Sequence, residues 1–510
     1  MQTLDILIWA VGIGLVASFI YLLYSYSKGL RSSPRELIIM FLAKIVEYSA
    51  YGAMNLSFVL YLSADCGLSD IAAGSYIGVW SMTLTLTMIL VGAVCDAIGI
   101  KKTLIGGTIF LLFARIFMPF TNNVVVTSIF GFLPLAVGTA ILGPVLSVGI
   151  KRYTTKEGSA LGFALFYTLM NVGWAIGGHI FDGVRGIFGE HSLVTLPVVG
   201  AQISTYQIIF LVAFFLTIPN LIILALMRDR VRMTEDQGVV IDPPDEKIAG
   251  GFFVAAWGTL KKAAKDTARI FGQVIIEKPF WIYLFMLAIL VPVRLVFYHF
   301  HYTFPKYGIR ILGEGVKIGN IYSVLNPTLI VFLVPLFGAL TRKISSYRMM
   351  LVGTLVSASS VFIATLPSEI FAPLVHTWFG ELVYDRWLGV PVEQRTPIFL
   401  SLVIFIAIFT IGEAIWSPRL MQFTAEIAPK GREGSYISLS YLPFFLAKLV
   451  AGPMSGLLLT AYVPVGAESY PHHHLVWVWI GGMAALSPLG LLLFRKLFNR
   501  AEEKEVTAVA

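Results

Sequence analysis

Apolar residues in this chain fall in long runs that short polar connections separate. Thirteen runs reach about 20 residues, and a helix of that length, rising 1.5 Å per residue, crosses a hydrocarbon core about 30 Å thick. Because lipid cannot satisfy backbone N–H and C=O groups, each run is expected to be a helix. The predicted spans are residues 4–26, 36–63, 71–98, 101–120, 124–150, 158–181, 205–228, 279–303, 317–341, 346–366, 396–424, 434–461 and 474–497.

Composition and charge agree with a multi-pass integral membrane protein. Of the 510 residues 57% are hydrophobic and 13% charged, well below the ~25% charged residues of soluble domains. The net charge of +8 does not indicate nucleic-acid binding, because seventeen Lys and Arg lie in alternate short connections and the C-terminal tail, against six in the opposite short connections. This asymmetry predicts an outside N-terminus, a cytoplasmic C-terminus and a location in the plasma (inner) membrane.

The polar loop 229–278 divides the remaining pattern into two halves of six spans. We therefore expect residues 36–228 and 279–497 to form two six-helix bundles, with a cytoplasmic tail at 498–510. Within the loop, residues 250–275 interleave aromatic and basic side chains, which fits either a helix on the anionic leaflet or a solvated linker helix. Residues 1–35 are interpreted as an extra transmembrane helix and its linker, because the first five residues contain no basic side chain and no signal-cleavage site follows.

A glycine-rich turn repeats at equivalent places in the two halves. The first copy begins at Gly92 and the second at Gly338, and each has a charge at its fifth position, Asp96 and Arg342. Such internal repetition indicates two related halves. The first copy, with Gly92, Asp96, Gly99, Lys101 and Lys102, resembles the G-x-x-x-D-x-x-G-x-[KR]-[KR] signature of the major facilitator superfamily. The resemblance implies that fold, and it implies that these residues and Arg342 act in cytoplasmic gating and not as substrate ligands.

Charged residues inside predicted spans are few, and they indicate the candidate site. A charge at mid-bilayer costs at least about 2.5–3.5 kcal/mol, so it normally faces a cavity or a partner. Glu47 and Glu413 are candidate proton-coupling carboxylates, Arg294 is a candidate ligand cation, and Lys44 is close enough to Glu47 to pair with it. The competing interpretation is static ion pairs between helices. Arg115, Arg419 and Lys448 lie nearer span ends, where snorkelling or gate pairing is expected.

Polar and aromatic residues near these charges complete the candidate cavity. They are Tyr48, Tyr51, Tyr167, Asn171, Trp174, His299 and Trp416. No metal site is expected, because His299 and His301 lie on different helix faces and the histidines at 472–474 have no carboxylate or thiolate nearby. No cofactor is expected either.

Several segments resemble the proton-dependent oligopeptide transporter family. They are Gly412–Pro418 with Glu413, the stretch from Ala428 to Gly434, the first core helix around Glu47, and residues 166–173 around Asn171. The resemblance implies that Glu413 receives the amino group of a peptide. The E-x-x-E-R cluster of that family is incomplete here, since Lys44 accompanies Glu47, and its helix 4 lysine is absent. A carboxylate-binding cation is therefore sought elsewhere, with Arg294 the candidate.

These features predict an alternating-access secondary transporter, with proton-coupled symport of a small organic solute, short peptides or peptide-like zwitterions included. The chain is expected to act as a monomer, with the solute, protons and membrane lipids as its partners. Two alternatives stay open, namely proton-driven export and a non-transporting receptor that keeps the fold. An enzyme is not expected, because the chain has neither a G-x-S-x-G turn nor an H-E-x-x-H pair.

Overall fold

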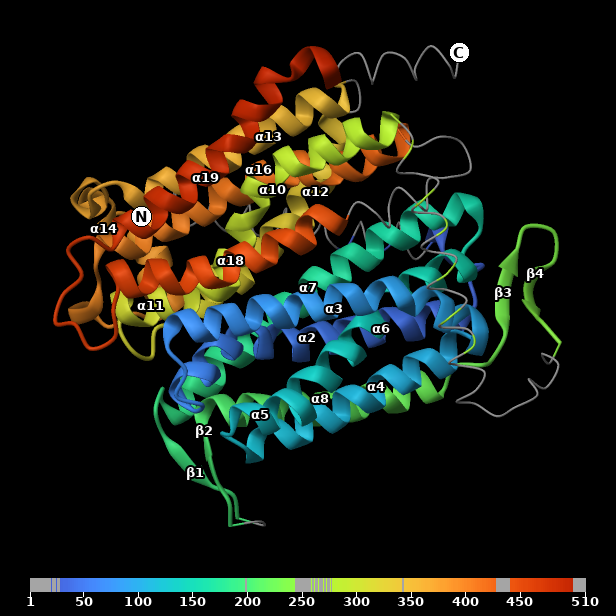
Figure 1. The fold of residues 1–510 in the computed structure, drawn as a ribbon, viewed down its shortest axis with the longest axis horizontal. Coiled ribbons are helices and arrows are strands. Elements are labelled where there is room, and N and C mark those ends of the chain that lie inside the picture. Colours follow the sequence, from blue (N-terminus) through green and yellow to red (C-terminus); the bar gives the residue numbers. More distant parts are fainter. Residues whose placement is uncertain are drawn as a thin grey trace. The chain divides into compact units, whose positions relative to one another are not determined.

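The computed structural model is almost entirely helical, and its helices match the predicted runs (Figure 1). It describes residues 28–197, 200–243, 278–341, 344–427 and 441–498, together with isolated positions between 20 and 276. The predicted extra helix, the amphipathic segment 250–275, the resemblance segment from Ala428 to Gly434 and the C-terminal tail lie almost wholly outside these residues. Within the described residues, the twelve spans predicted for the two bundles are helical over most of their length.

The chain forms two compact units. Unit 1 comprises residues 1–55, 83–184 and 191–266, and unit 2 comprises residues 56–82, 185–190 and 267–510. The boundary runs through helices α2 (Arg35–Ala64), α3 (Asp70–Ile98) and α7 (Lys156–Phe188). The division at loop 229–278 stays a prediction, and each unit is described separately below.

Unit 1 is built from parts of α2, α3 and α7 and from helices that pack on one another through glycine. Its further elements are α4 (Ile100–Phe117), a 3-10 turn (Met118–Phe120), α5 (Val124–Thr127), a π-helical turn (Ser128–Phe132), α6 (Leu133–Tyr153), β1 (Leu193–Thr195), β2 (Gln202–Ser204), α8 (Thr205–Ala225), β3 (Val231–Thr234) and β4 (Gly238–Ile241). A Cβ on Gly107 of α4 would lie 2.6 Å from Ile141, and one on Gly138 of α6 would lie 2.7 Å from Leu111. These glycines therefore set the close α4–α6 contact, as small residues do between membrane helices.

Two antiparallel hairpins accompany the helices of unit 1. Strands β1 and β2 pair in register Val194 to Ile203, and β2 leads directly into α8, whose start is fixed by a capping box between Ser204 and Gln207. Strands β3 and β4 pair within the stretch expected to be loop, and β3 contacts α6. The β3–β4 hairpin is thus a folded element where the sequence analysis expects only a polar connection.

Unit 2 contains the helices of the second half together with the adjoining ends of α2 and α3. Its elements are α10 (Lys278–Tyr302), α11 (Phe304–Leu312), a π-helical turn (Asn320–Val324), α12 (Leu325–Leu340), α13 (Ser346–Val361), 3-10 turns (Phe362–Thr365, Ser368–Phe371 and Val392–Gln394), α14 (Ala372–Val375), α15 (Trp378–Glu381), a second π-helical turn (Leu382–Leu388), α16 (Pro397–Ile427), α18 (Tyr441–Tyr462) and α19 (His474–Leu493). A buried apolar cluster joins α10, α13 and α19 around Tyr283, Met350 and Leu491. Gly353 and Gly412 let α13 and α16 approach closely.

Ten helices of the described residues are long and apolar enough to cross a membrane, and Leu446–Tyr462 of α18 is a shorter apolar helix. Most large hydrophobic side chains on their outer faces are exposed in the isolated protein, for example Phe215 at 60% and Ile222 at 59%. Exposed apolar belts of this kind need lipid around them.

Candidate functional site

A buried arginine holds the carboxylate of Glu47 in unit 1. Arg115 Nη2 donates to Glu47 Oε1 at 2.6 Å and Arg115 Nη1 donates to Oε2 at 3.0 Å, so that α2 and α4 are joined by a bidentate pair. The Arg115 side chain is 0% exposed and the Glu47 side chain is 3% exposed. Arg115 Nη1 also donates to Thr217 on α8. The sequence analysis expects snorkelling or gate pairing for Arg115. Snorkelling toward a span end is wrong, because the side chain is fully buried and paired with Glu47.

Lys44 lies one turn before Glu47 and contacts aromatic rings. Its Nζ is 3.9 Å from the ring centroid of Tyr48 and 3.8 Å from that of Phe166 on α7, and the residue is 2% exposed. The charge of Glu47 acts on Lys44, but both oxygens of that carboxylate are held by Arg115. Cation–π contacts of a desolvated ammonium contribute about 2 kcal/mol, so the two rings are its main support.

Three of the predicted wall residues form one aromatic group between α2 and α7. The ring of Trp174 lies edge-on to Tyr48 and Tyr51, with centroids 6.4 and 5.5 Å apart. Asn171 and Tyr167 lie on α7, where the Asn171 amide donates to the Tyr167 carbonyl at 2.9 Å. The structure therefore brings Lys44 and these aromatic residues together in unit 1.

The carboxylate of Glu413 has a different environment, inside unit 2. Asn326 Nδ2 on α12 donates to Glu413 Oε2 at 2.8 Å and also lies 2.9 Å from Thr410 Oγ1. Glu413 is 6% exposed. Arg294 on α10 is within electrostatic range of Glu413, and its guanidinium lies 4.6 Å from the ring centroid of Phe297. Glu413 thus contacts a neutral amide, with a cation nearby.

A second cation shares this region of α10. Lys448 on α18 interacts electrostatically with Arg294, lies 5.8 Å from the ring centroid of Tyr298 and approaches the Ser81 carbonyl at 3.4 Å. The sequence analysis expects snorkelling or gate pairing for Lys448. In the structure its ammonium lies close to Tyr298 and the Ser81 carbonyl. Arg294, Lys448 and Glu413 together carry one net positive charge.

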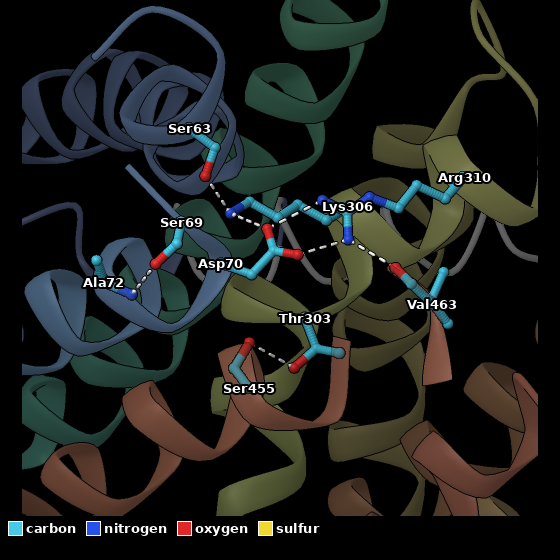
Figure 2. A network of polar contacts seen from close by, with 9 residues as sticks. All are labelled: Ser63, Ser69, Asp70, Ala72, Thr303, Lys306, Arg310, Ser455 and Val463. Atoms are coloured by element: carbon cyan, nitrogen blue, oxygen red, sulfur yellow. Dashed lines mark hydrogen bonds and ion pairs between the residues drawn. The ribbon is translucent and has the colours of Figure 1, made fainter. Parts of the chain in front are cut away.

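Two other predicted site residues have packing or hydrogen-bonding positions. Trp416 is 1% exposed and packs on Gly353 of α13. A Cβ added at Gly353 would lie 2.7 Å from the Cβ of Trp416. His299 is fully buried, and its Nδ1 lies 2.8 Å from Thr303 Oγ1. Thr303 in turn donates to Ser455 at 2.9 Å (Figure 2). We therefore leave Trp416 and His299 out of the site proposed below.

A charge cluster that the sequence analysis missed lies at the start of α3. Asp70 accepts from Lys306 Nζ at 2.9 Å and from Arg310 Nη1 and Nη2 at 2.7 and 2.9 Å (Figure 2). Lys306 Nζ also donates to Ser63 at 2.5 Å, and Arg310 Nη1 to the Val463 carbonyl at 2.8 Å. The cluster, called the Asp70 cluster below, ties the ends of α2, α3 and α18 to α11. Lys306 and Arg310 are four residues apart, a spacing that could have indicated a shared helix face.

Glycines bring α3 and α18 together next to the Asp70 cluster. A Cβ on Gly78 would lie 2.8 Å from the Lys448 carbonyl, and one on Gly456 would lie 2.5 Å from the Asp70 carbonyl. The Ser81 and Tyr302 hydroxyls also join α3 to α10 at 2.8 Å. At these glycine positions α3 and α18 leave no space for a Cβ between them.

The predicted gate residues are only partly described. Gly92 and Asp96 belong to α3, but their surroundings lie outside the described part of the structure, and Arg342 lies outside it entirely. Gly99 has φ 85°, a conformation that suits glycine, and it separates α3 from α4. Lys101 and Lys102 form the first turn of α4. In the described residues, no group of three or more His, Cys, Asp and Glu side chains is arranged to hold a metal ion.

Comparisons with known proteins place this geometry in a family. The model of the Major Facilitator Superfamily matches residues 40–384. No curated protein matches the chain. Among solved structures, a peptide transporter POT in complex with sulfate superposes with a TM-score of 0.63 at 17% identity, covering 92% of this chain and 96% of that one.

Two further structures have the same fold. A POT family transporter in complex with 5-aminolevulinic acid gives a TM-score of 0.61 at 17% identity and covers 91% of this chain and 97% of that one. Another POT family transporter, in complex with a thioalcohol conjugated peptide, gives a TM-score of 0.61 at 17% identity. The match covers 92% of this chain and 99% of that one. The chain is an integral, multi-pass membrane protein that shares the fold of these transporters, and with a family model matched over more than half its length it belongs to the Major Facilitator Superfamily.

Proposed function

We propose that this protein is a secondary transporter that works by alternating access and couples proton movement to symport of a small carboxylate-bearing solute. Short peptides and peptide-like zwitterions are the favoured class. The observation that carries the proposal is the contrast between two buried carboxylates, Glu47 beside an arginine and Glu413 beside an amide.

The two carboxylates are suited to different tasks. Glu47 accepts two charge-assisted hydrogen bonds from Arg115, and a protonated Glu47 would leave that cation buried without compensation. Glu413 accepts one hydrogen bond from neutral Asn326, which a protonated carboxyl group can keep through its carbonyl oxygen. Glu413 can therefore exchange a proton at low cost, and we assign proton coupling to it and a structural role to the Glu47–Arg115 pair.

The charges around Glu413 indicate the solute class. Arg294 and Lys448 exceed the single carboxylate by one positive charge, so an incoming carboxylate would neutralise the group. An amino group on the same solute would be received by Glu413 when it is ionised. This is the charge pattern of a zwitterion, and two of the structural relatives hold 5-aminolevulinic acid and a conjugated peptide.

The Asp70 cluster fits a closed gate at the outer face. The distribution of Lys and Arg predicts that the α2–α3 turn faces outside, and the cluster joins helix ends from both sequence halves there. Breaking these ion pairs would free the outer ends of α3 and α18, as alternating access requires.

A transport assay tests the proposal. The full-length protein is reconstituted in proteoliposomes, and counterflow is measured with di- and tripeptides, amino acids and organic anions at two pH values. We expect counterflow of a carboxylate-bearing solute and accumulation driven by an inward proton gradient. Accumulation driven only by an outward gradient would indicate export, and the absence of counterflow across the panel would favour a receptor.

Removing the charge of Asp70 is expected to destabilise unit 2. Asp70→Asn leaves Lys306 and Arg310 without their carboxylate, and breaking a buried pair in this way costs about 3–5 kcal/mol, with the lower end expected because Arg310 is 14% exposed. The free energy of unfolding is measured by denaturant titration in detergent. Glu369→Gln, at an exposed acid in the connection after α13, is the control, and equal stability of the two variants would contradict the assignment.

A further inference from the structure

A pocket lined by basic residues lies at one end of unit 1. It has a volume of about 340 Å³ and is formed by the start of α4, the end of α6 and the segment that carries the β3–β4 hairpin. We propose that this basic pocket binds a phosphate group, from an anionic phospholipid or from a soluble phosphorylated compound.

The charge of the lining favours an anion. Five cations, Lys101, Lys102, Arg152, Arg228 and Arg230, line the pocket with the carboxylates of Asp229 and Asp242. Asp242 is paired with Arg152 at 3.2 Å and with Arg232 at 2.6 Å, and Arg228 is paired with Glu36 at 2.8 Å. The side chains of Lys101, Lys102 and Arg230 make no hydrogen bond or ion pair with any side chain or backbone group that the structure describes. These three cations are available to a ligand, and phosphate oxygens can accept from all of them.

The backbone of the pocket is shaped for the same ligand. Arg230 has φ 58°, which is uncommon for a residue with a side chain and directs the chain from α8 into β3 along the pocket wall. The first turn of α4 follows Gly99, which offers no side-chain cap, so its N–H groups add positive potential at the wall formed by Ile100 and Lys101. The hairpin thus closes a site that the two helices alone would leave open.

The position of the pocket suits either source of phosphate. It lies at the ends of two predicted spans, and the distribution of Lys and Arg predicts that this face is cytoplasmic, where anionic lipids attract basic residues. A soluble phosphorylated compound would reach the same opening from the cytoplasm. This inference does not depend on the transported solute.

Binding measurements on the full-length protein test the proposal. In nanodiscs of mixed phosphatidylglycerol and phosphatidylcholine, native mass spectrometry is expected to show retained phosphatidylglycerol. In lipid-free detergent, equilibrium binding of inorganic phosphate is measured separately. Arg230→Gln is expected to lower the affinity for whichever probe binds by about tenfold, because one charge-assisted hydrogen bond to the ligand is lost. Retention of lipid without binding of inorganic phosphate identifies the lipid as the source, and binding of inorganic phosphate identifies the phosphate group as sufficient.

Lys151→Gln is the matched control, because Lys151 is an exposed cation next to Arg152 that does not line the pocket. It is expected to change binding by less than about twofold, as surface charges contribute little. Lys102→Gln, in the first turn of α4, is a second test should Arg230→Gln fold poorly, and size-exclusion profiles check both variants. The proposal is overturned if neither probe binds, or if Lys151→Gln weakens binding as much as the pocket variants.

Discussion

Glu47→Gln is expected to lower the free energy of unfolding by about 3–5 kcal/mol, the cost of removing one partner from a buried ion pair. The glutamine leaves the Arg115 guanidinium charged, fully buried and without its carboxylate. The Thr217 hydroxyl also accepts a hydrogen bond from that guanidinium, but a hydroxyl cannot neutralise its charge. Denaturant titration of the purified protein in detergent measures the loss, and solute counterflow is expected to fall with the folded fraction.

The double variant Glu47→Gln with Arg115→Met separates a structural pair from a coupling carboxylate. Removing both charges is expected to recover most of the lost stability, because no ion then remains buried alone. Proton-driven accumulation should survive in the double variant in proportion to the folded protein. If stability recovers while coupling to protons is abolished, Glu47 would be the coupling carboxylate and the assignment to Glu413 would be wrong.

The helices could be predicted from the sequence because lipid imposes one strong rule on them. Runs of about 20 apolar residues must be helical in a bilayer, and the predicted 205–228 and 474–497 correspond to Thr205–Ala225 and His474–Leu493. The candidate charges could be found by the same rule, since a buried Glu413 or Arg294 stands out against an apolar background. These charged residues could be identified because charges are rare within the predicted spans, and no particular spacing between them was needed.

The partners of these charges could not be predicted, because they come from helices far apart in the chain. Arg115 is 68 residues from Glu47, and Asn326 is 87 residues from Glu413. Sequence proximity favoured Lys44 as the partner of Glu47, whereas the bidentate geometry of a guanidinium holds the carboxylate more strongly than an ammonium. The Asp70 cluster was missed for the same reason, with 236 residues between Asp70 and Lys306.

The β3–β4 hairpin was missed although its signal was present. Residues 231–234 and 238–241 are short β-prone segments, and they flank a turn that ends in Gly238 with φ 68°. The acidic and basic residues around them led to the interpretation of a polar loop. A hairpin that closes a pocket against α4 and α6 depends on tertiary contacts, which charge content does not reveal.

Glu413→Gln is expected to abolish proton-driven accumulation while leaving in place the counterflow of an organic anion that has a carboxylate and no amino group. Glutamine has nearly the shape of glutamate and can still accept the hydrogen bond from Asn326 Nδ2, but it cannot take up or release a proton. The measurement compares gradient-driven uptake and counterflow of the same solute in proteoliposomes. Glu393→Gln, at an exposed acid in the connection before α16, is the control and is expected to retain both activities.

The two assays together decide the role of Glu413. Loss of accumulation with retained counterflow means that the solute still binds and crosses while the proton no longer does, as the amide environment of Glu413 predicts. Wild-type accumulation in Glu413→Gln would exclude this carboxylate as the proton carrier. Loss of both activities in a folded variant would assign Glu413 to solute binding, and the coupling proton would then have to be sought at another titratable group. Because the substitution leaves Arg294 and Lys448 in place, a solute that binds through its carboxylate alone should keep its counterflow.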